Sequence, residues 1–251
     1  MHSISAVNTG KAAGKPLQGG VALITGGSRG IGKAIAMRLA TLGAAVGICG
    51  RDEEKLILAV RELEASGAKV FARRADVTKE MEIRAFLDAT EKQLGGITIL
   101  VNNAGTGGGG FGAIQEKSES EWDEVMNTNL KSVFFVSRAV IPGMIQRRGG
   151  DIINISSLAG KNTFAGGGIY CASKWGLQGL SGCMAEDLRA HGIRVSVICP
   201  GSVATDFQGR GPKDPSKVLT AEDVAHAVAM VAIQGPQSFI SEVHLRPVAK
   251  P

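Results

Sequence analysis

Tyr170, the only tyrosine in this chain of 251 residues, stands four positions before Lys174 in the segment "YCASK". On a helix this spacing places both side chains on one face. A phenol has a reference pKa of about 10, and a nearby ammonium in a partly desolvated site favours the phenolate. Lowering that pKa by about 3 units requires about 4 kcal/mol. The pair predicts a proton donor whose pKa the lysine lowers, although Tyr170 alone could equally be a half-buried aromatic residue.

A glycine-rich segment, "TGGSRGIG" from Thr25 to Gly32, lies between an apolar run and a helical pattern. Gly26 permits a tight turn, Gly30 lets the backbone approach a pyrophosphate, and Gly32 allows close packing of helix on strand. The amino terminus of the helix would face the anion. By itself such a turn could be a plain loop, but its place after the first strand of an α/β pattern predicts a dinucleotide site.

The end of the second apolar run, "ICGRDEE", bears on the choice of cofactor. A carboxylate at this point accepts from the ribose of NAD, whereas a cation accommodates the additional phosphate of NADP. Gly50 occupies the acid's place, Arg51 follows it, and Arg29 lies in the glycine loop. Asp52 is expected to cap the next helix, which leaves Arg51 available. NADP(H) is the predicted cofactor, and the alternative is that Arg51 is only a surface residue.

Seven short apolar runs with helical segments between them would position these residues. The runs begin at Val21, Ala44, Ala68, Ile97, Asp151, Ile193 and Ser238. Most are apolar at nearly every position, as in parallel strands covered on both faces. The pattern predicts a single-domain α/β Rossmann fold, a doubly wound seven-stranded parallel sheet with ligands at the carboxyl ends of the strands. Residues 1–18 are expected to be a flexible tail and residues 19–251 the domain.

Composition excludes several other classes of function. The net charge of +5 comes from scattered residues, with no basic face for nucleic acid. No apolar run is long enough to cross a membrane or to act as a signal peptide, which indicates a cytoplasmic protein. The four cysteines and four histidines have no metal-ligand spacing, so no metal site is predicted and the cysteines are expected to be reduced. No serine lies in the GxSxG elbow of a hydrolase.

Five motifs in order, "TGGSRGIG", "NNAG", "NISS", "YCASK" and "PGSVAT", resemble those of the short-chain dehydrogenase/reductase family. The resemblance implies a cytosolic nicotinamide-dependent oxidoreductase, a homo-oligomer with a tetramer favoured over a dimer, and a small-molecule substrate. It implies the catalytic residues Asn129, Ser157, Tyr170 and Lys174, with Ser157 preferred to Ser156. The implied cofactor contacts are Gly26, Ser28, Arg29, Gly30, Ile31, Gly32, Arg51, Asp76, Val77, Asn102, Ala104, Gly105, Tyr170, Lys174, Pro200, Gly201, Val203 and Thr205.

By this resemblance Ser157 donates to a substrate carbonyl, Tyr170 protonates the alkoxide, Lys174 binds the nicotinamide ribose, and Asn129 orients water. The catalytic core most resembles reductases of 3-oxoacyl thioesters. The ending "SEVHLRPVAKP" instead resembles members that act on 3-hydroxy acids and small alcohols, which is kept as the alternative. A non-enzymatic NADP-binding regulator is disfavoured because all four catalytic side chains are present.

Overall fold

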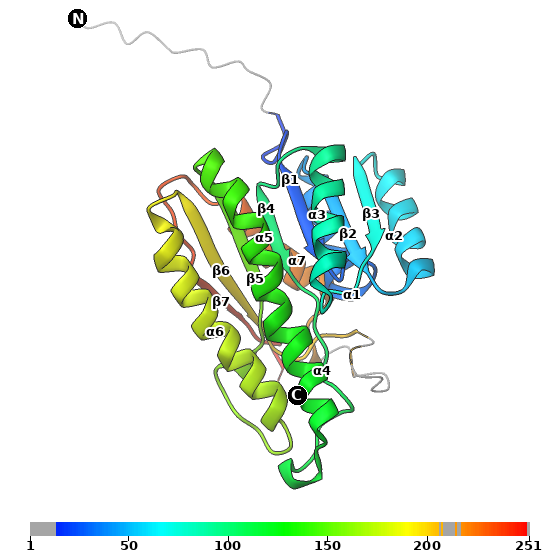
Figure 1. The fold of residues 1–251 in the computed structure, drawn as a ribbon, viewed down its shortest axis with the longest axis vertical. Helices are drawn as coiled ribbons and strands as arrows, with labels where there is room; N and C mark the ends of the chain where they lie inside the picture. The colour runs from blue at the N-terminus through cyan, green and yellow to red at the C-terminus, as the bar shows by residue number, and fades with distance from the viewer. Residues whose placement is uncertain (1–13, 206, 208–213, 215–216, 250–251) are drawn as a thin grey trace, which may run out of the picture.

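Seven parallel strands form one sheet in the order β3-β2-β1-β4-β5-β6-β7 (Figure 1). The structure is a computed structural model that describes residues 14–205, 207, 214 and 217–249. The strands are β1 (Val21–Thr25), β2 (Ala45–Gly50), β3 (Val70–Arg74), β4 (Ile99–Asn102), β5 (Gly150–Ile155), β6 (Ile193–Pro200) and β7 (Glu242–Leu245). The predicted fold, seven parallel strands in a doubly wound sheet, is confirmed.

Helices lie on both faces of this sheet. They are α1 (Gly30–Thr41), α2 (Glu53–Ala65), α3 (Glu80–Leu94), α4 (Glu119–Met126), α5 (Ser132–Arg147), α6 (Gly168–Arg189) and α7 (Ala221–Ala232). Two short 3-10 helices, η1 (Ile114–Glu116) and η3 (Leu158–Gly160), and one π-helical turn, η2 (Asn127–Lys131), complete the set. None of the helices in the described part of the chain combines the length and apolar character needed to span a membrane.

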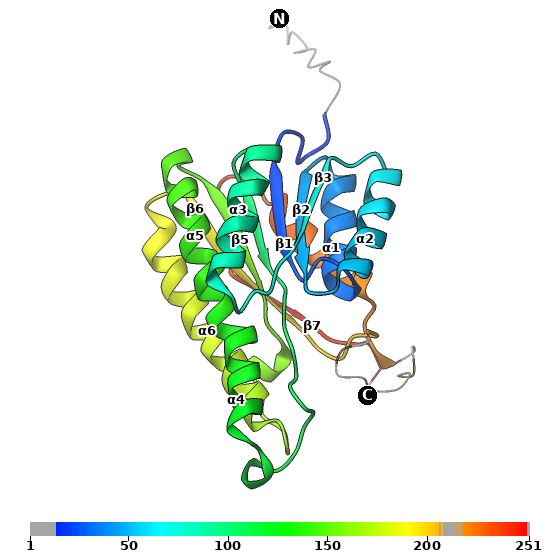
Figure 2. The same ribbon diagram turned by 45° about the vertical axis from the view of Figure 1, so that its right-hand side comes forward.

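Two apolar layers hold the sheet between its helices. On one face, buried residues of β1, β2 and β6 such as Ile24 and Ile198 pack against α1, α2 and α7. On the other, Leu100 and Ile152 pack against α3, α5 and α6, which lie in front of the sheet in Figure 1 and to its left in Figure 2. The central strands are buried on both faces because both layers cover them. The edge strands β3 and β7 are more exposed.

The packed part of the chain begins earlier than the sequence predicts. The backbone N–H of Leu17 donates to the Leu42 carbonyl at 2.9 Å, and the Leu17 side chain packs against the α1 layer. Leu17, which the sequence places in the expected tail, is therefore anchored to the domain by its apolar side chain. The rest of the expected tail, residues 1–13, lies outside the described residues.

Candidate active site

A cleft of about 1290 Å³ lies at the carboxyl ends of the strands. Its walls come from the segments that follow every strand of the sheet. It brings together most of the predicted site residues: Gly26, Ser28, Arg29, Gly30, Ile31, Arg51, Asp76, Val77, Ala104, Gly105, Ser157, Tyr170, Lys174, Pro200, Gly201, Val203 and Thr205. Three predicted residues, Gly32, Asn102 and Asn129, do not line it.

The glycine loop after β1 forms one end of this cleft. Gly26 and Gly30 have φ values of 66° and 52°, which favour glycine. A Cβ atom on Gly32 would lie 2.2 Å from the Gly26 carbonyl oxygen, so α1 packs against the loop without room for a side chain. The side chain of Arg29, the first residue before α1, makes no capping hydrogen bond to the helix, and the first turn of α1 has no acidic residue. Backbone N–H groups and a glycine cradle there fit a pyrophosphate.

Cations line the part of the cleft where the additional phosphate of NADP would lie. A Cβ atom on Gly50 would lie 2.9 Å from Ser28 Oγ, so a carboxylate side chain fits there only if Ser28 moves. Arg29, Arg51 and Lys55 line the same end of the cleft. Asp52 caps α2 as predicted, accepting from the Lys55 backbone N–H at 3.1 Å. The residues present therefore fit NADP(H) better than NAD(H).

Asp76, after β3, is held in one orientation beside this end. Its Oδ1 accepts from the backbone N–H and the hydroxyl of Thr78, at 2.9 Å and 2.8 Å. Partial burial acts to raise the pKa of Asp76, but these hydrogen bonds and the Arg51 charge outweigh it and lower the pKa. The carboxylate stays ionised and acceptor-only, as recognition of an amino or hydroxyl donor requires.

Ser157 and Tyr170 lie together at the end of the cleft opposite the glycine loop. Ser157 follows β5, where its Oγ accepts from the Ala159 backbone N–H at 3.1 Å and lies near enough to Tyr170 to affect the pKa of its hydroxyl. Burial raises the pKa of Tyr170 to about 12, although Ser157 acts to lower it. The prediction of a lowered pKa is wrong for this geometry, since desolvation outweighs the effect of Ser157. Tyr170 is thus a neutral acid at physiological pH.

Lys174 lies one helical turn after Tyr170 on α6, as the spacing predicts. Its side chain is buried, and its Nζ donates to the Ile155 carbonyl at 2.9 Å while lying 5.8 Å from the centre of the Tyr170 ring. Burial lowers the pKa of Lys174 to about 8. The ammonium therefore faces the cleft, but at this distance from the ring it does not offset the desolvation of the phenol.

Asn129 lies in the π-helical turn between α4 and α5, a kind of distortion common at functional sites. Its Oδ1 accepts from the Thr106 backbone N–H at 2.8 Å. Its Nδ2 donates to the Thr106 carbonyl at 2.9 Å and to Ser173 Oγ at 3.0 Å. The side chain thus joins the loop after β4 to α6, beside Lys174. It acts as a positioning residue in this structure, and its role in orienting water remains a prediction.

Asn102 was predicted to contact the cofactor, but it does not line the cleft. It is buried beneath the sheet, where its Nδ2 donates to Asn154 Oδ1 at 2.9 Å and to Ser137 Oγ at 3.2 Å. The next residue, Asn103, lines the cleft instead and donates to the Thr25 and Gly26 carbonyls at 2.9 Å and 3.2 Å. Successive side chains of a strand point to opposite faces, and this alternation was the signal that could have separated the two.

Aromatic residues from the loops around the cleft lie beside the Tyr170 ring. The Phe111 and Phe207 rings lie 5.9 Å and 6.1 Å from the Tyr170 ring, and Phe164 lies 4.8 Å from Phe111. All three line the cleft, with Leu158 beside them. Arg246, just after β7, lines the cleft as well. The wall beside Tyr170 is therefore apolar, and a cation lines the same cleft.

Comparison with known proteins agrees with this geometry. A family model described as short chain dehydrogenase matches residues 20–215. A protein of Streptomyces violaceoruber named as a ketoacyl reductase of the granaticin polyketide synthase is 42% identical over 208 residues, 82% of this chain and 74% of the relative. The 3-oxoacyl-[acyl-carrier-protein] reductase of Staphylococcus epidermidis is 38% identical over 223 residues, 84% of this chain and 90% of the relative.

A solved structure shows the same arrangement. The crystal structure of a metagenomic short-chain oxidoreductase in complex with NADP is 43% identical and superposes with a TM-score of 0.82. The match covers 94% of this chain and 100% of the other. Family model, relatives and fold agree with the five motifs seen in the sequence. The chain belongs to the short-chain dehydrogenase/reductase family of oxidoreductases.

Proposed function

We propose that this protein uses NADPH to reduce a carbonyl group to a secondary alcohol, reversibly. The observation that carries this proposal is that Ser157 and the neutral Tyr170 lie together in a cleft whose other end fits a dinucleotide phosphate. A proton donor and a second hydroxyl on one side of a cleft suit a carbonyl oxygen.

In the mechanism, Ser157 donates a hydrogen bond to the carbonyl oxygen and fixes its direction. The nicotinamide of NADPH, when bound, supplies the hydride. Tyr170 then transfers its proton to the alkoxide oxygen as charge develops there. Lys174, the neighbouring ammonium, lowers the energy of the phenolate that remains. Asn129 keeps the loop after β4 and α6 at a fixed separation, so that Lys174 stays in place.

The preferred cofactor follows from the phosphate-side residues. Arg29, Arg51 and Lys55 supply positive charge beside Gly50, where a carboxylate would repel a phosphate. The solved relative that contains NADP supports the same choice. NADPH is therefore expected to be used much more efficiently than NADH.

The leading substrate class is 3-oxoacyl thioesters. Two relatives about 40% identical to this chain are named as reductases of ketoacyl substrates. Phe111, Phe164 and Phe207 offer an apolar surface beside Tyr170, suited to the carbon chain of such a substrate. The apolar wall also suits other hydrophobic ketones.

A 3-hydroxy acid is the second candidate, and Arg246 favours it. This cation lies in the same cleft as Tyr170, where it could pair with a substrate carboxylate. It lies in the ending "SEVHLRPVAKP", which resembles that of family members acting on 3-hydroxy acids. Arg246→Gln would distinguish the two classes, because it should raise the KM for 3-oxo acids about tenfold or more and leave that for thioesters unchanged.

The direct test is a panel of 3-oxoacyl thioesters, 3-oxo acids and neutral ketones, each assayed with NADPH and NADH by cofactor absorbance. The expected result is turnover with NADPH, with the highest kcat/KM for thioesters. Comparable rates with both cofactors would contradict the phosphate-site assignment. No turnover of any carbonyl, with NADPH binding intact, would overturn the proposed activity in favour of a nucleotide-binding regulator.

We further propose a homotetramer in the cytoplasm. Trp122, Phe134 and Trp175, on α4, α5 and α6, have 44%, 43% and 49% of their surface exposed, which is unusual for large apolar side chains. A helical face of this kind would be covered in an oligomer. Light scattering after size exclusion measures the mass, and a monomer at micromolar concentration would contradict the assembly.

A further inference from the structure

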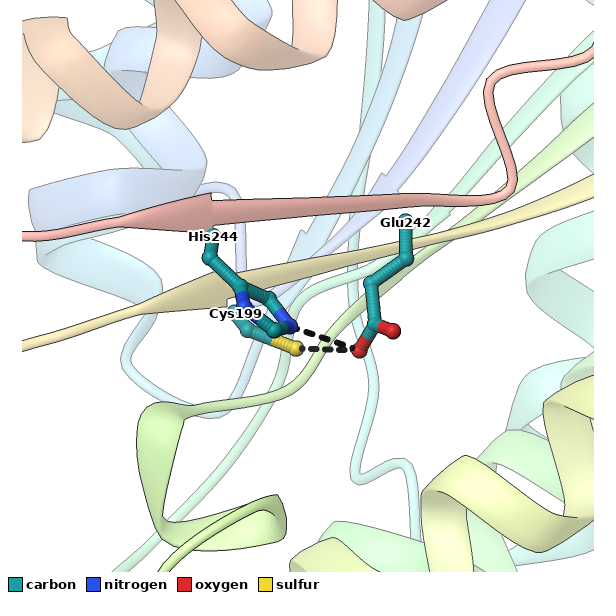
Figure 3. A group of neighbouring side chains, drawn as sticks. All are labelled: Cys199, Glu242 and His244. Atoms are coloured by element: carbon teal, nitrogen blue, oxygen red, sulfur yellow. Dashed lines mark hydrogen bonds and ion pairs between the residues drawn. The ribbon is translucent and has the colours of Figure 1, made fainter.

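Three side chains with metal-binding atoms come together on the paired strands β6 and β7 (Figure 3). Glu242 and His244 are two residues apart on β7, so they project from the same face of the strand. Cys199 on β6 is the register partner of His244. Figure 3 shows all three side chains directed toward one another on this face. Strand pairing therefore brings a thiol from β6 to a carboxylate and an imidazole that lie more than forty residues later in the sequence.

The distances among these atoms suit a tetrahedral ion. Glu242 Oε1 lies 3.1 Å from His244 Nε2 and 3.3 Å from Cys199 Sγ, and all three ligand atoms lie within 4.8 Å of one another. A tetrahedral zinc ion with bonds of about 2.0–2.3 Å separates its ligand atoms by about 3.3–3.6 Å. Shifts of a few tenths of an ångström would bring the carboxylate to the required distance from the other two donors.

The surroundings allow entry of an ion. The side chains of Glu242 and His244 are 31% and 44% exposed, so the site is open to solvent and can retain a water as fourth ligand. Gln178 donates from Nε2 to Cys199 Sγ at 3.1 Å, a contact that supports a coordinating thiolate. One group competes with a metal: Lys161 Nζ lies 2.8 Å from Glu242 Oε1, on a side chain that is itself partly exposed.

We propose that Cys199, Glu242 and His244 form a binding site for Zn²⁺. Thiolate and imidazole donors favour zinc, or Co²⁺ as its spectroscopic substitute, over Mg²⁺ and Ca²⁺. On binding, the Cys199 thiol releases its proton to solvent, a metal–sulfur bond forms, and Lys161 leaves the carboxylate. No oxidation or reduction takes place. The ion links the exposed edge strand β7 to β6 and so stabilises the carboxyl-terminal edge of the sheet.

The inference does not depend on the proposed enzymatic activity and is tested by metal titration. The full chain, freed of metal with a chelator, is titrated with Zn²⁺ against a chromophoric chelator and with Co²⁺ in the near ultraviolet. The expected results are one Zn²⁺ per chain, a thiolate-to-cobalt charge-transfer band, and a higher Tm with Zn²⁺. Absence of the cobalt band, or of Zn²⁺ binding at micromolar concentration, would overturn the proposal.

Variants locate the site. Cys199→Ser and His244→Ala should each weaken Zn²⁺ binding by about a hundredfold, and Cys199→Ser should also remove the cobalt band. The matched controls Cys183→Ser and His226→Ala remove the same residue types elsewhere and should change nothing. Equal weakening by the controls would show binding at other residues and contradict the assignment.

One variant should strengthen binding, so the test does not depend on variants that fail to fold. Lys161→Met removes the competing cation from Glu242 and should increase Zn²⁺ affinity several-fold, with circular dichroism unchanged. An unchanged or reduced affinity in a folded Lys161→Met protein would contradict coordination by Glu242.

Discussion

The two ends of the cleft are built in different ways. At the phosphate end, the site consists mainly of backbone shape: Gly26, Gly30 and Gly32 leave space, and the amino terminus of α1 supplies N–H groups. At the carbonyl end, function depends on side-chain groups, with Ser157, Tyr170 and Lys174 held by hydrogen bonds and burial. The first end should be sensitive to added atoms, and the second to the loss of particular functional groups.

This difference explains why the two ends carry different energetic costs. The phosphate end needs no buried charge of its own, because its cations lie at the surface beside Gly50. The carbonyl end keeps a lysine buried with its pKa lowered to about 8. The fold there is less stable than an apolar equivalent would be, as expected where a charged group is retained for function. Four substitutions test this contrast.

Tyr170→Phe should have the largest effect. It removes the proton donor but retains the ring, so kcat should fall by about a thousandfold, within the range for losing a general acid. NADPH binding, followed by fluorescence titration, should change little because the phosphate end is untouched. A Tyr170→Phe protein with more than a tenth of the wild-type kcat would show that the proton comes from another group. The carbonyl end would then not depend on this side chain.

Gly32→Ala should act at the other end through volume alone. The added Cβ would lie 2.2 Å from the Gly26 carbonyl oxygen, so the loop or α1 must move. The expected loss is about 3 kcal/mol of unfolding free energy, with weaker NADPH binding. Gly235→Ala, in an exposed loop, is the control, because apart from its chain neighbours no atom of the described chain lies within 4 Å of that Cβ position. Its free energy of unfolding should be unchanged or higher. Equal effects of both variants would contradict the steric explanation.

Lys174→Met should lower activity less than Tyr170→Phe does, but it should stabilise the fold. Burial lowers the lysine pKa from 10.5 to about 8. Below pH 8, keeping the charged lysine buried lowers the free energy of unfolding of the wild type by about 3 kcal/mol. The variant gains this back, but it loses about 1 kcal/mol with the hydrogen bond to the Ile155 carbonyl. The variant should therefore be about 2 kcal/mol more stable at pH 7.

The pH dependence gives a second measurement of the same substitution. Between pH 8 and 10.5 the unfolded chain binds more protons than the native one, so wild-type stability rises with pH and the variant's advantage shrinks. Urea unfolding at pH 7 and pH 10 measures both values. Lys92→Met, on the exposed surface of α3, should show neither change. A destabilised Lys174→Met protein at pH 7 would mean that the lysine is not penalised by burial.

Arg51→Ala should have the smallest effect of the four. Loss of one charge-assisted contact to a phosphate should raise the KM for NADPH about tenfold and leave that for NADH nearly unchanged. Arg61→Ala, an exposed arginine on α2, is the matched control. If KM rose equally for both cofactors, Arg51 would not distinguish NADP from NAD, and the phosphate end would depend on backbone alone.

The local parts of the molecule were predictable from sequence. The glycine loop, the Asp52 cap and the spacing of Tyr170 and Lys174 depend on residues within a few positions of one another, and the apolar runs predicted all seven strands. Asn102 and Asn103 were confused because both lie at a strand end, where alternation decides which side chain reaches the cleft. The Tyr170 pKa was misjudged because burial depends on the whole fold.

Long-range pairing accounts for what the sequence could not indicate. Phe111 and Phe207 approach Tyr170 from two separate segments, and Phe164 packs against Phe111. Cys199 meets Glu242 and His244 only because β6 pairs with β7 in one register. Shifting that register by a single residue would turn the β7 side chains to the opposite face. Spacing rules that look for ligands within a few residues therefore predicted no metal site.

The strand arrangement also has a consequence for folding. Each strand from β1 to β7 is followed by residues that line the cleft, from Gly26 after β1 to Arg246 after β7. Non-local parallel pairing of this kind forms late and slowly, because the chain loses entropy in bringing distant segments together before their contacts stabilise the sheet. A chain with six strands paired would therefore lack a complete cleft. Recovery of activity after dilution from denaturant should report completion of the whole sheet, lagging behind the return of helical circular dichroism.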